Sequence, residues 1–313
     1  MSGDIFAQVN LSRVYRRRKW VNNFILGLTG LTVILAIIPL IWIIVYVIIK
    51  GWRVINLDFF IHLPTAMGVP GGGVTNAIQG SIVMVIVASI IAIPIALLIA
   101  FYLLYYPQTK LGLSIKFSTD LLSGVPSIVI GIFGYALFVV PVKHYSAWAG
   151  GLVLAMIMLP VVVRSSEEML KLVPKELREG SLALGAPEWK TSFSVILVAA
   201  LEGVITGIML GLARAIGETA PLLFTALGNE HYDVFSYIKQ GIETNQSFWD
   251  ILHKILSEPT DALPLTLWKY AQQPYPERVE QSWGVALVLM LLVLLLNIGS
   301  RSWLAWRRRQ THG

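Results

Sequence analysis

The sequence predicts an all-α, polytopic membrane protein with six transmembrane helices and both termini in the cytoplasm. Three observations support this prediction: an apolar composition, six long stretches with few or no charges, and basic residues concentrated on one side. Of the 313 residues, 56% are hydrophobic and 13% are charged, and the mean hydropathy is +0.70. Because soluble domains carry about 25% charged residues, this composition excludes an ordinary soluble enzyme.

The spans are predicted from length, since about 20 apolar residues cross a hydrocarbon core roughly 30 Å thick. Six stretches satisfy this length: 24–49, 78–106, 121–142, 145–163, 199–224 and 282–304. Only Lys143 and His144 separate the third from the fourth, which predicts an antiparallel pair with a short turn. Prolines within the spans are interpreted as packing features rather than hinges, because neighbouring helices can satisfy the freed carbonyls. These prolines are Pro39, Pro94, Pro126 and Pro160.

The distribution of Lys and Arg predicts the orientation. Sixteen basic residues lie in the terminal segments and the even-numbered loops, seven lie on the other side, and one lies within a span. We therefore expect a cytoplasmic tail over 1–23, a six-helix transmembrane domain over 24–304 and a cytoplasmic basic tail over 305–313. Within that domain, 164–198 is a cytoplasmic loop and 226–281 is a periplasmic loop. The uncharged run of the first span is too long for a signal peptide, so we expect it to be retained.

Several chemistries are excluded or disfavoured by the residues that the chain lacks. There is no cysteine, no phosphate-binding loop, no metalloprotease motif and no histidine cluster, so we expect no cofactor and no metal on this chain. The net charge of +6 is spread over topological anchors rather than gathered in one patch. We therefore expect a lipid bilayer, and no nucleic acid, as the surrounding partner.

The cytoplasmic loop contains the signals of two short helices. Pro174 fits the first turn of one helix, Gly185 can end it in the left-handed conformation, and Pro187 with Glu188 can start the next. The result is a helix-Gly-helix elbow below the membrane. The residues alone leave two interpretations open with equal weight, an interfacial helix pair and a docking element for a partner.

Arg214 and Glu218 place two charges inside the fifth span. One charge at the bilayer centre costs about 2.5 to 3.5 kcal/mol, so such residues usually face a cavity or a partner. One interpretation is that Arg214 lines an aqueous path and donates to an oxyanion, while Glu218 holds the arginine or gates access. The other is a salt bridge or an inter-subunit pair that fixes helix packing. A stripe of small residues already provides close packing, which favours the functional interpretation. The stripe is Gly203, Gly207 and Gly211.

The outer loop contains a possible capping box at Ser247 and Asp250, which predicts a short helix from residue 248. Its apolar positions share one face, so we expect it to lie on the membrane surface or to cover the spans. These positions are Phe248, Ile251, Leu252 and Ile255.

Two motifs resemble a known family. Glu179, Gly180 and Ser181, followed by Leu184 and Gly185, resemble the EAA motif of ABC importer permeases. Residues 213–227, which include Arg214, Glu218 and Thr219, resemble the signature of phosphate ABC importer permeases of the PstA type. Further similar segments keep the family's order: 71–77, 123–129, 164–174 and 263–269. Val198 and Glu202 stand where that family often has prolines, and the stretch over 229–262 is longer.

The resemblance implies a type I ABC importer permease in a bacterial inner membrane, without catalytic activity of its own. It implies ATPase-coupling roles for Glu179, Gly180, Ser181, Leu184 and Gly185. It implies a substrate pathway for inorganic phosphate at Arg214, Glu218 and Thr219. Its partners would be a homologous permease (PstC type), an ATPase dimer that holds ATP and Mg (PstB type) and an external phosphate-binding protein (PstS type).

Three other functions are weighed against it. A permease for another oxyanion, such as sulfate or molybdate, is the main rival, because arginine does not choose among tetrahedral anions. A secondary anion transporter would use Arg214 and Glu218 as an anion and proton site, but no internal repeat is visible. An intramembrane enzyme based on Ser123 or Ser127 lacks an evident partner residue in the spans.

Overall fold

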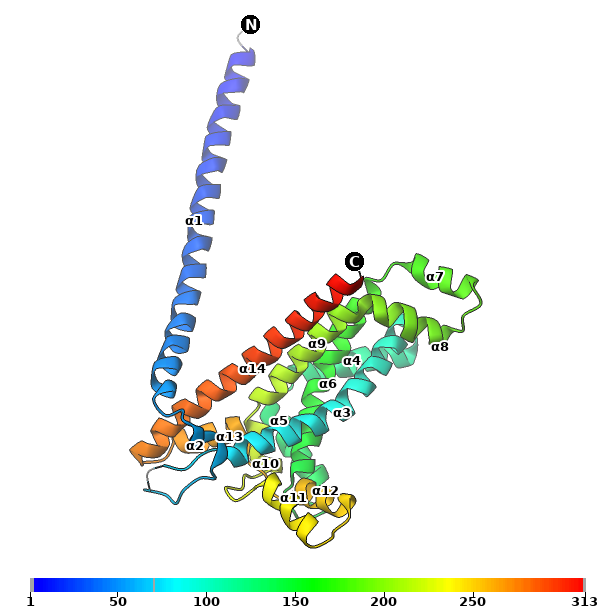
Figure 1. The fold of residues 1–313 in the computed structure, drawn as a ribbon. Coiled ribbons are helices and arrows are strands. Elements are labelled where there is room, and N and C mark those ends of the chain that lie inside the picture. Colours follow the sequence, from blue (N-terminus) through cyan, green and yellow to red (C-terminus); the bar gives the residue numbers. More distant parts are fainter. Residues whose placement is uncertain (1–2, 70, 312–313) are drawn as a thin grey trace.

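The computed structural model describes residues 3–69 and 71–311, and most of this part of the chain is helical (Figure 1). The long elements are α1 (Gly3–Trp52), α3 (Thr75–Tyr105), α4 (Lys110–Gly124), α6 (Ala147–Lys171), α9 (Leu197–Gly217) and α14 (Pro276–Thr311). The shorter helices are α2 (Leu57–Ile61), α5 (Ser127–Gly134), α7 (Lys175–Ala183), α8 (Glu188–Thr191), α10 (Ala220–Thr225), α11 (Val234–Glu243), α12 (Phe248–Ser257) and α13 (Leu263–Ala271). Two π-helical turns are η1 (Tyr135–Val139) and η2 (Ser192–Ile196).

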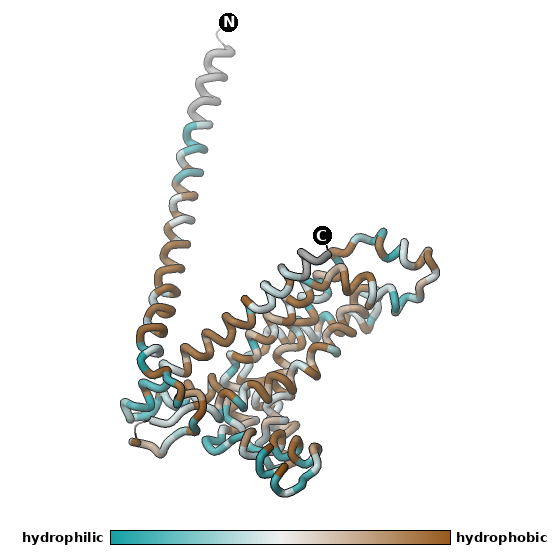
Figure 2. The backbone as a smooth tube through the Cα atoms, in the orientation of Figure 1, coloured by the Kyte–Doolittle hydropathy of each residue, from teal (hydrophilic) through white to brown (hydrophobic). Residues whose placement is uncertain are grey.

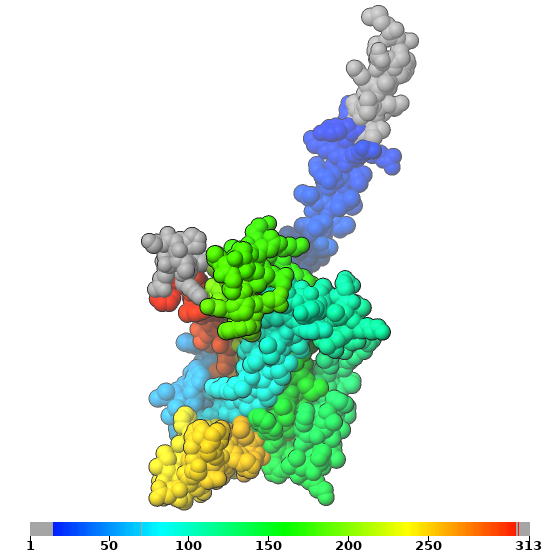
Figure 3. Space-filling model, turned by 90° about the vertical axis from the view of Figure 1, so that its right-hand side faces the viewer, coloured from blue at the N-terminus to red at the C-terminus, as the bar shows by residue number. Residues whose placement is uncertain are grey.

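The hydropathy of the chain separates a long apolar middle from two polar ends (Figure 2). In the described residues, five helices are long and apolar enough to cross a bilayer, and a bent pair makes a sixth if it counts as one span. The elbow of α7 and α8 lies at one end, and the hairpin of α11 and α12 lies at the other (Figure 3). The terminal ends of α1 and α14 point toward the elbow end (Figure 1).

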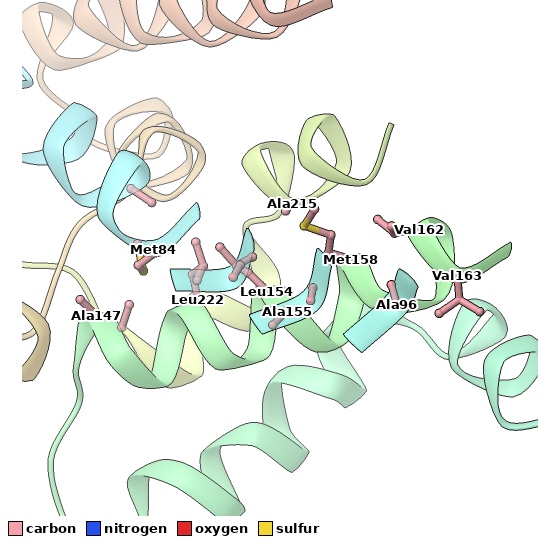
Figure 4. Packing of buried hydrophobic residues seen from close by; sticks show 14 of the residues in the cluster. Met84, Ala96, Ala147, Leu154, Ala155, Met158, Val162, Val163, Ala215 and Leu222 are labelled. Carbon is pink, nitrogen blue, oxygen red and sulfur yellow. The ribbon is translucent and has the colours of Figure 1, made fainter. Parts of the chain in front are cut away.

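Helix α6 is the centre of the fold, because it packs against both α3 and α9. The face of α3 that meets α6 carries a fully buried alanine every four residues: Ala88, Ala92, Ala96 and Ala100. On α6, a Cβ added to Gly151 would lie 2.5 Å from Val87 Cγ1, so only glycine permits this approach. Small residues let spanning helices gain dispersion contacts where lipid offers no hydrophobic driving force. Figure 4 shows the resulting core around Met84, Leu154 and Met158.

The glycine stripe on α9 packs against α6, as the sequence suggested. A Cβ added to Gly207 would meet Ser165 Oγ at 1.8 Å, and one added to Gly211 would meet Val162 Cγ2 at 2.7 Å. Gly203 lies equally close to Met169. These three glycines bring α9 close to α6, so the close approach of the two helices does not require Arg214.

The third predicted span, 121–142, is not one straight helix. Helix α4 ends at Gly124, and α5 with η1 continues from Ser127 at an angle of 106°. Pro126 caps α5 instead of lying inside a helix, so its interpretation as a packing feature was wrong. The physical reason is that proline disfavours helical dihedrals in the preceding residue, and Val125 is indeed extended.

Helix α1 lies apart from the bundle along most of its length (Figures 1 and 3). Its apolar window between Tyr15 and Trp52 is 0% buried. It meets α14 only near its end, where the ring centroids of Tyr46 and Trp283 are 5.0 Å apart. Residues 3–23 of the predicted N-terminal tail and the first span therefore belong to one helix, whose apolar surface is available to lipid or another chain.

A buried polar network anchors the outer loop to the bundle. Lys269 Nζ lies 2.9 Å from Asp261 Oδ2, and Asn76 Nδ2 donates to the same carboxylate and to Asn229 O. The Leu263 N–H donates to Ser81 Oγ at 2.8 Å. The predicted capping box at the start of α12 is confirmed. These contacts fix the loop that follows α10.

Candidate functional site

The fifth predicted span, 199–224, is interrupted where its charged residues lie. Helix α9 ends at Gly217, Glu218 is extended, and α10 begins at Ala220 with Pro221 in its first turn. The predicted span 199–224 therefore consists of one long helix and one short helix, with a break at Glu218 and Thr219. Pro221 explains part of the break, because proline fits a first turn but not a helix interior.

The three predicted pathway residues all lie at this break. Arg214 is in the last turn of α9, where the helix dipole favours a cation, and Glu218 and Thr219 form the linker. Arg214 Nε is 3.7 Å from Glu218 Oε1, so the predicted ion pair forms although the helix ends between them. The Arg214 side chain is 41% exposed, whereas that of Glu218 is 14% exposed.

The guanidinium of Arg214 has donors to spare. Its distance to Glu218 allows an ion pair but exceeds hydrogen-bond length, and no other hydrogen bond of its side chain occurs within residues 3–69 and 71–311. Arginine carries five N–H donors in a planar fork. Thr219 likewise makes no side-chain capping bond to α10. The break therefore combines a cation, a carboxylate and a hydroxyl with unused hydrogen-bonding capacity.

The second halves of the two interrupted helices contact each other. A Cβ added to Gly131 of α5 would lie 2.6 Å from Pro221 Cα of α10, so their backbones touch. Irregular backbone at membrane depth is tolerated where protein buries it or where it lines a water-filled cavity. The sequence contained signals for the two breaks, in Gly124-Val125-Pro126 and in Gly217 to Pro221, but none for the contact between α5 and α10.

The predicted helix-Gly-helix elbow is confirmed. Helix α7 follows Pro174, Gly185 ends it with a φ of +82°, and α8 follows Pro187. Ser181 Oγ lies 2.8 Å from Thr191 Oγ1, and Arg178 Nη2 lies 3.3 Å from Glu188 Oε1. These two contacts join α7 to α8.

Tyr105, at the end of α3, fastens the elbow to the bundle. Its ring lies under the Arg178 guanidinium at 4.6 Å, and its hydroxyl is 2.6 Å from Ser192 Oγ in η2. A movement of the elbow would therefore be transmitted directly to a spanning helix.

The residues predicted to couple to an ATPase do not all point the same way. Glu179, Gly180, Leu184 and Gly185 are exposed, and Leu184 is 91% exposed, whereas Ser181 turns inward to α8. Exposed Leu177 and Trp189 add apolar surface to the elbow. A large exposed apolar surface outside the spans is typical of a protein interface.

The sequence of the chain is similar to those of several known proteins. The chain matches the family model described as "Binding-protein-dependent transport system inner membrane component" over residues 92–310. It is 37% identical over 290 residues to "Phosphate transport system permease protein PstA" of Yersinia pestis, with 92% of this chain and 91% of that protein covered. The namesake of Pasteurella multocida is 38% identical over 285 residues, covering 91% of this chain and 94% of the relative.

More distant proteins agree as well. "Phosphate transport system permease protein PstA 1" of Mycobacterium tuberculosis is 35% identical over 303 residues, covering 94% of this chain and 91% of its own. Among solved structures, an inward-facing MetNI methionine ABC transporter is similar with a TM-score of 0.52 and 18% identity. That likeness covers 74% of this chain and 92% of the other, and at such identity it concerns the fold alone.

Proposed function

Because the chain belongs to the family of binding-protein-dependent transport system inner membrane components, we propose that phosphate crosses this permease at the helix break around Arg214. The chain is a non-catalytic, multi-pass inner-membrane permease subunit of a phosphate ABC importer. ATP is hydrolysed on a separate subunit.

The unused donors of Arg214 are the observation on which the proposal rests. Phosphate offers several acceptor oxygens, and the planar fork of arginine can engage two of them at once. The carboxylate of Glu218, at 3.7 Å, balances the charge of the guanidinium when no anion is present. An arriving phosphate would displace this weak partner rather than a formed hydrogen bond.

The residues at the helix break would bind a phosphate ion weakly enough to release it during transport. The hydroxyl of Thr219, which makes no capping bond to α10, adds a donor beside the arginine, while the repulsion from Glu218 limits how tightly phosphate is held. Discontinuous helices whose ends face a substrate recur in membrane transporters.

The elbow supplies the coupling to ATP hydrolysis in this proposal. Its exposed face, with Glu179, Gly180, Leu184 and Gly185, docks to an ATPase dimer that holds ATP and Mg. A homologous PstC-type permease completes the pathway, and an external PstS-type protein delivers phosphate. Support comes from the exposed apolar surface of the elbow and from its attachment to α3 through Tyr105.

Replacing Arg214 with lysine tests the proposal. Arg214→Lys keeps the charge but loses the bidentate fork, so we expect radiolabelled phosphate uptake to fall at least tenfold while membrane insertion and ATPase recovery persist. Arg301→Lys, the same change at an exposed position of α14, should transport normally. Undiminished uptake by Arg214→Lys would refute the assignment.

Competition measurements distinguish phosphate from other oxyanions. In cells that carry the complete importer, excess sulfate or molybdate should leave phosphate uptake unchanged, and unlabelled phosphate should abolish it. Inhibition by sulfate would favour a permease for another oxyanion, and uptake that persists without the ATPase would favour a secondary transporter.

A further inference from the structure

A cavity lies beneath the elbow, away from Arg214. Its volume is about 400 Å³, and it is bounded by α7, by the ends of α3 and α6, and by η2. Its lining includes Leu104, Lys171, Val173, Lys175, Arg178 and Leu182. We call it the elbow cavity.

The floor of the elbow cavity is apolar. Leu104, Val173 and Leu182 line it and are partly exposed, whereas Leu170 and Ile196 also line it but are only 1% and 3% exposed. Helices α3 and α6 are membrane-spanning helices that end here, so the cavity lies at the boundary between the bilayer and water on the elbow side. An apolar floor at this depth suits hydrocarbon better than a small hydrated ion.

The rim of the elbow cavity has three cations, Lys171, Lys175 and Arg178, and one carboxylate, Glu179. Lys171 is paired with Glu167 at 2.5 Å, and Arg178 is held by Glu188 and by the ring of Tyr105. Lys175 makes no ion pair with any residue of 3–69 or 71–311. Its ammonium is therefore free to receive an anion beside two cations whose positions are already fixed.

We propose that the elbow cavity binds an anionic phospholipid of the inner leaflet, with its phosphate at Lys175 and Arg178 and acyl carbons over Leu104, Val173 and Leu182. Basic pockets next to spanning helices on the cytoplasmic side suit anionic headgroups. Free inorganic phosphate would use the same cations but leave the apolar floor unfilled. The lipid would contact the side of α7 that lines the cavity. Leu177 and Leu184 are exposed and do not line the cavity, so they remain available to the ATPase. A lipid at this position would set the angle of the elbow and thereby tune coupling.

Photolabelling of the full chain, co-purified with its transporter subunits, tests this site. Phosphatidylglycerol with a photoreactive group near the headgroup should label peptides of residues 170–182, and phosphatidylcholine with the same group should not. Lys175→Gln should lower the phosphatidylglycerol yield about fivefold, since one cation near the surface contributes about 1 kcal/mol. Lys190→Gln is the matched control, because Lys190 lies in the same elbow but outside the cavity.

A second variant separates the lipid from the charge. Leu182→Trp fills the cavity without altering its charge and should also reduce labelling, while the variant still co-purifies with the ATPase. Equal yields from Lys175→Gln and Lys190→Gln, equal labelling by both lipids, or displacement of the label by inorganic phosphate would each overturn the proposal. Photolabelling does not require transport, so it tests the lipid site independently of the proposed role of Arg214 in the phosphate pathway.

Discussion

At Gly207 the absence of a side chain decides how closely two spanning helices approach. Because an added Cβ would lie 1.8 Å from Ser165 Oγ, Gly207→Leu forces α9 away from α6. Overpacking of this kind costs about 1 to 3 kcal/mol, so we expect a lower melting temperature of the purified protein. Gly299→Leu is the control, because no atom lies within 4 Å of its Cβ position. An unchanged melting temperature for Gly207→Leu would contradict the packing described here.

The sequence predicted the ion pair between Arg214 and Glu218, but not the end of helix α9 between them. The i,i+4 spacing was sufficient to bring Arg214 and Glu218 together, and the structure has them 3.7 Å apart. The break between them was not predicted, because the apolar run continues through Leu222 and Phe224 and hydropathy does not distinguish a bent span from a straight one. Pro221 marked the break, but proline occurs both in first turns and in kinked spans.

At the scale of an element, the elbow depends on one left-handed residue. Gly185 has a φ of +82°, whereas proline is fixed near −65°, so Gly185→Pro should reorient α8 relative to α7. We expect normal membrane insertion but loss of ATPase co-purification or of uptake. The separate variant Gly185→Asn should largely keep ATPase co-purification and uptake, because asparagine tolerates the left-handed region. If Gly185→Pro coupled normally, the elbow would not be the docking element.

Helix α11 depends on the charge of its N-cap. Burial alone raises the pKa of Asp233, but hydrogen bonds from Ser236, Gln79 and backbone N–H groups outweigh it and hold the pKa below 3.8. A lowered pKa means that the stabilisation is present above the unfolded value and is lost as the pH falls through the folded value. The α11–α12 hairpin should therefore loosen only in acid.

Hydrogen exchange of the hairpin tests this dependence. Asp233→Ala should cost about 1 kcal/mol, which is roughly fivefold faster exchange over 234–243 at pH 7. The difference from the unaltered protein should shrink as the pH falls below 3.8. Glu243→Gln, at an exposed position of the same helix, should have little effect. A difference that stays constant with pH would show that the carboxylate charge is not responsible.

At the scale of the whole molecule, the absence of cysteine makes the topology directly measurable. We expect Ser236→Cys in the outer hairpin to react with a membrane-impermeant maleimide in intact spheroplasts. Lys190→Cys in the elbow should react only after lysis, because basic residues are concentrated on the cytoplasmic side. The opposite labelling pattern would reverse the predicted orientation.

The sequence by itself determined the helical class, the number of apolar stretches, the elbow signals and the residues of the two motifs. These are local properties, since hydropathy, proline, glycine and the spacing of charges act within a few turns. Only the tertiary structure decided that α4 and α5 meet at 106°, that α5 touches α10 at Gly131 and Pro221, and that a cavity opens below α7. These features depend on contacts between segments up to about a hundred residues apart in the chain. A hydropathy pattern contains no information on which apolar faces meet, whereas close packing between small residues selects one arrangement.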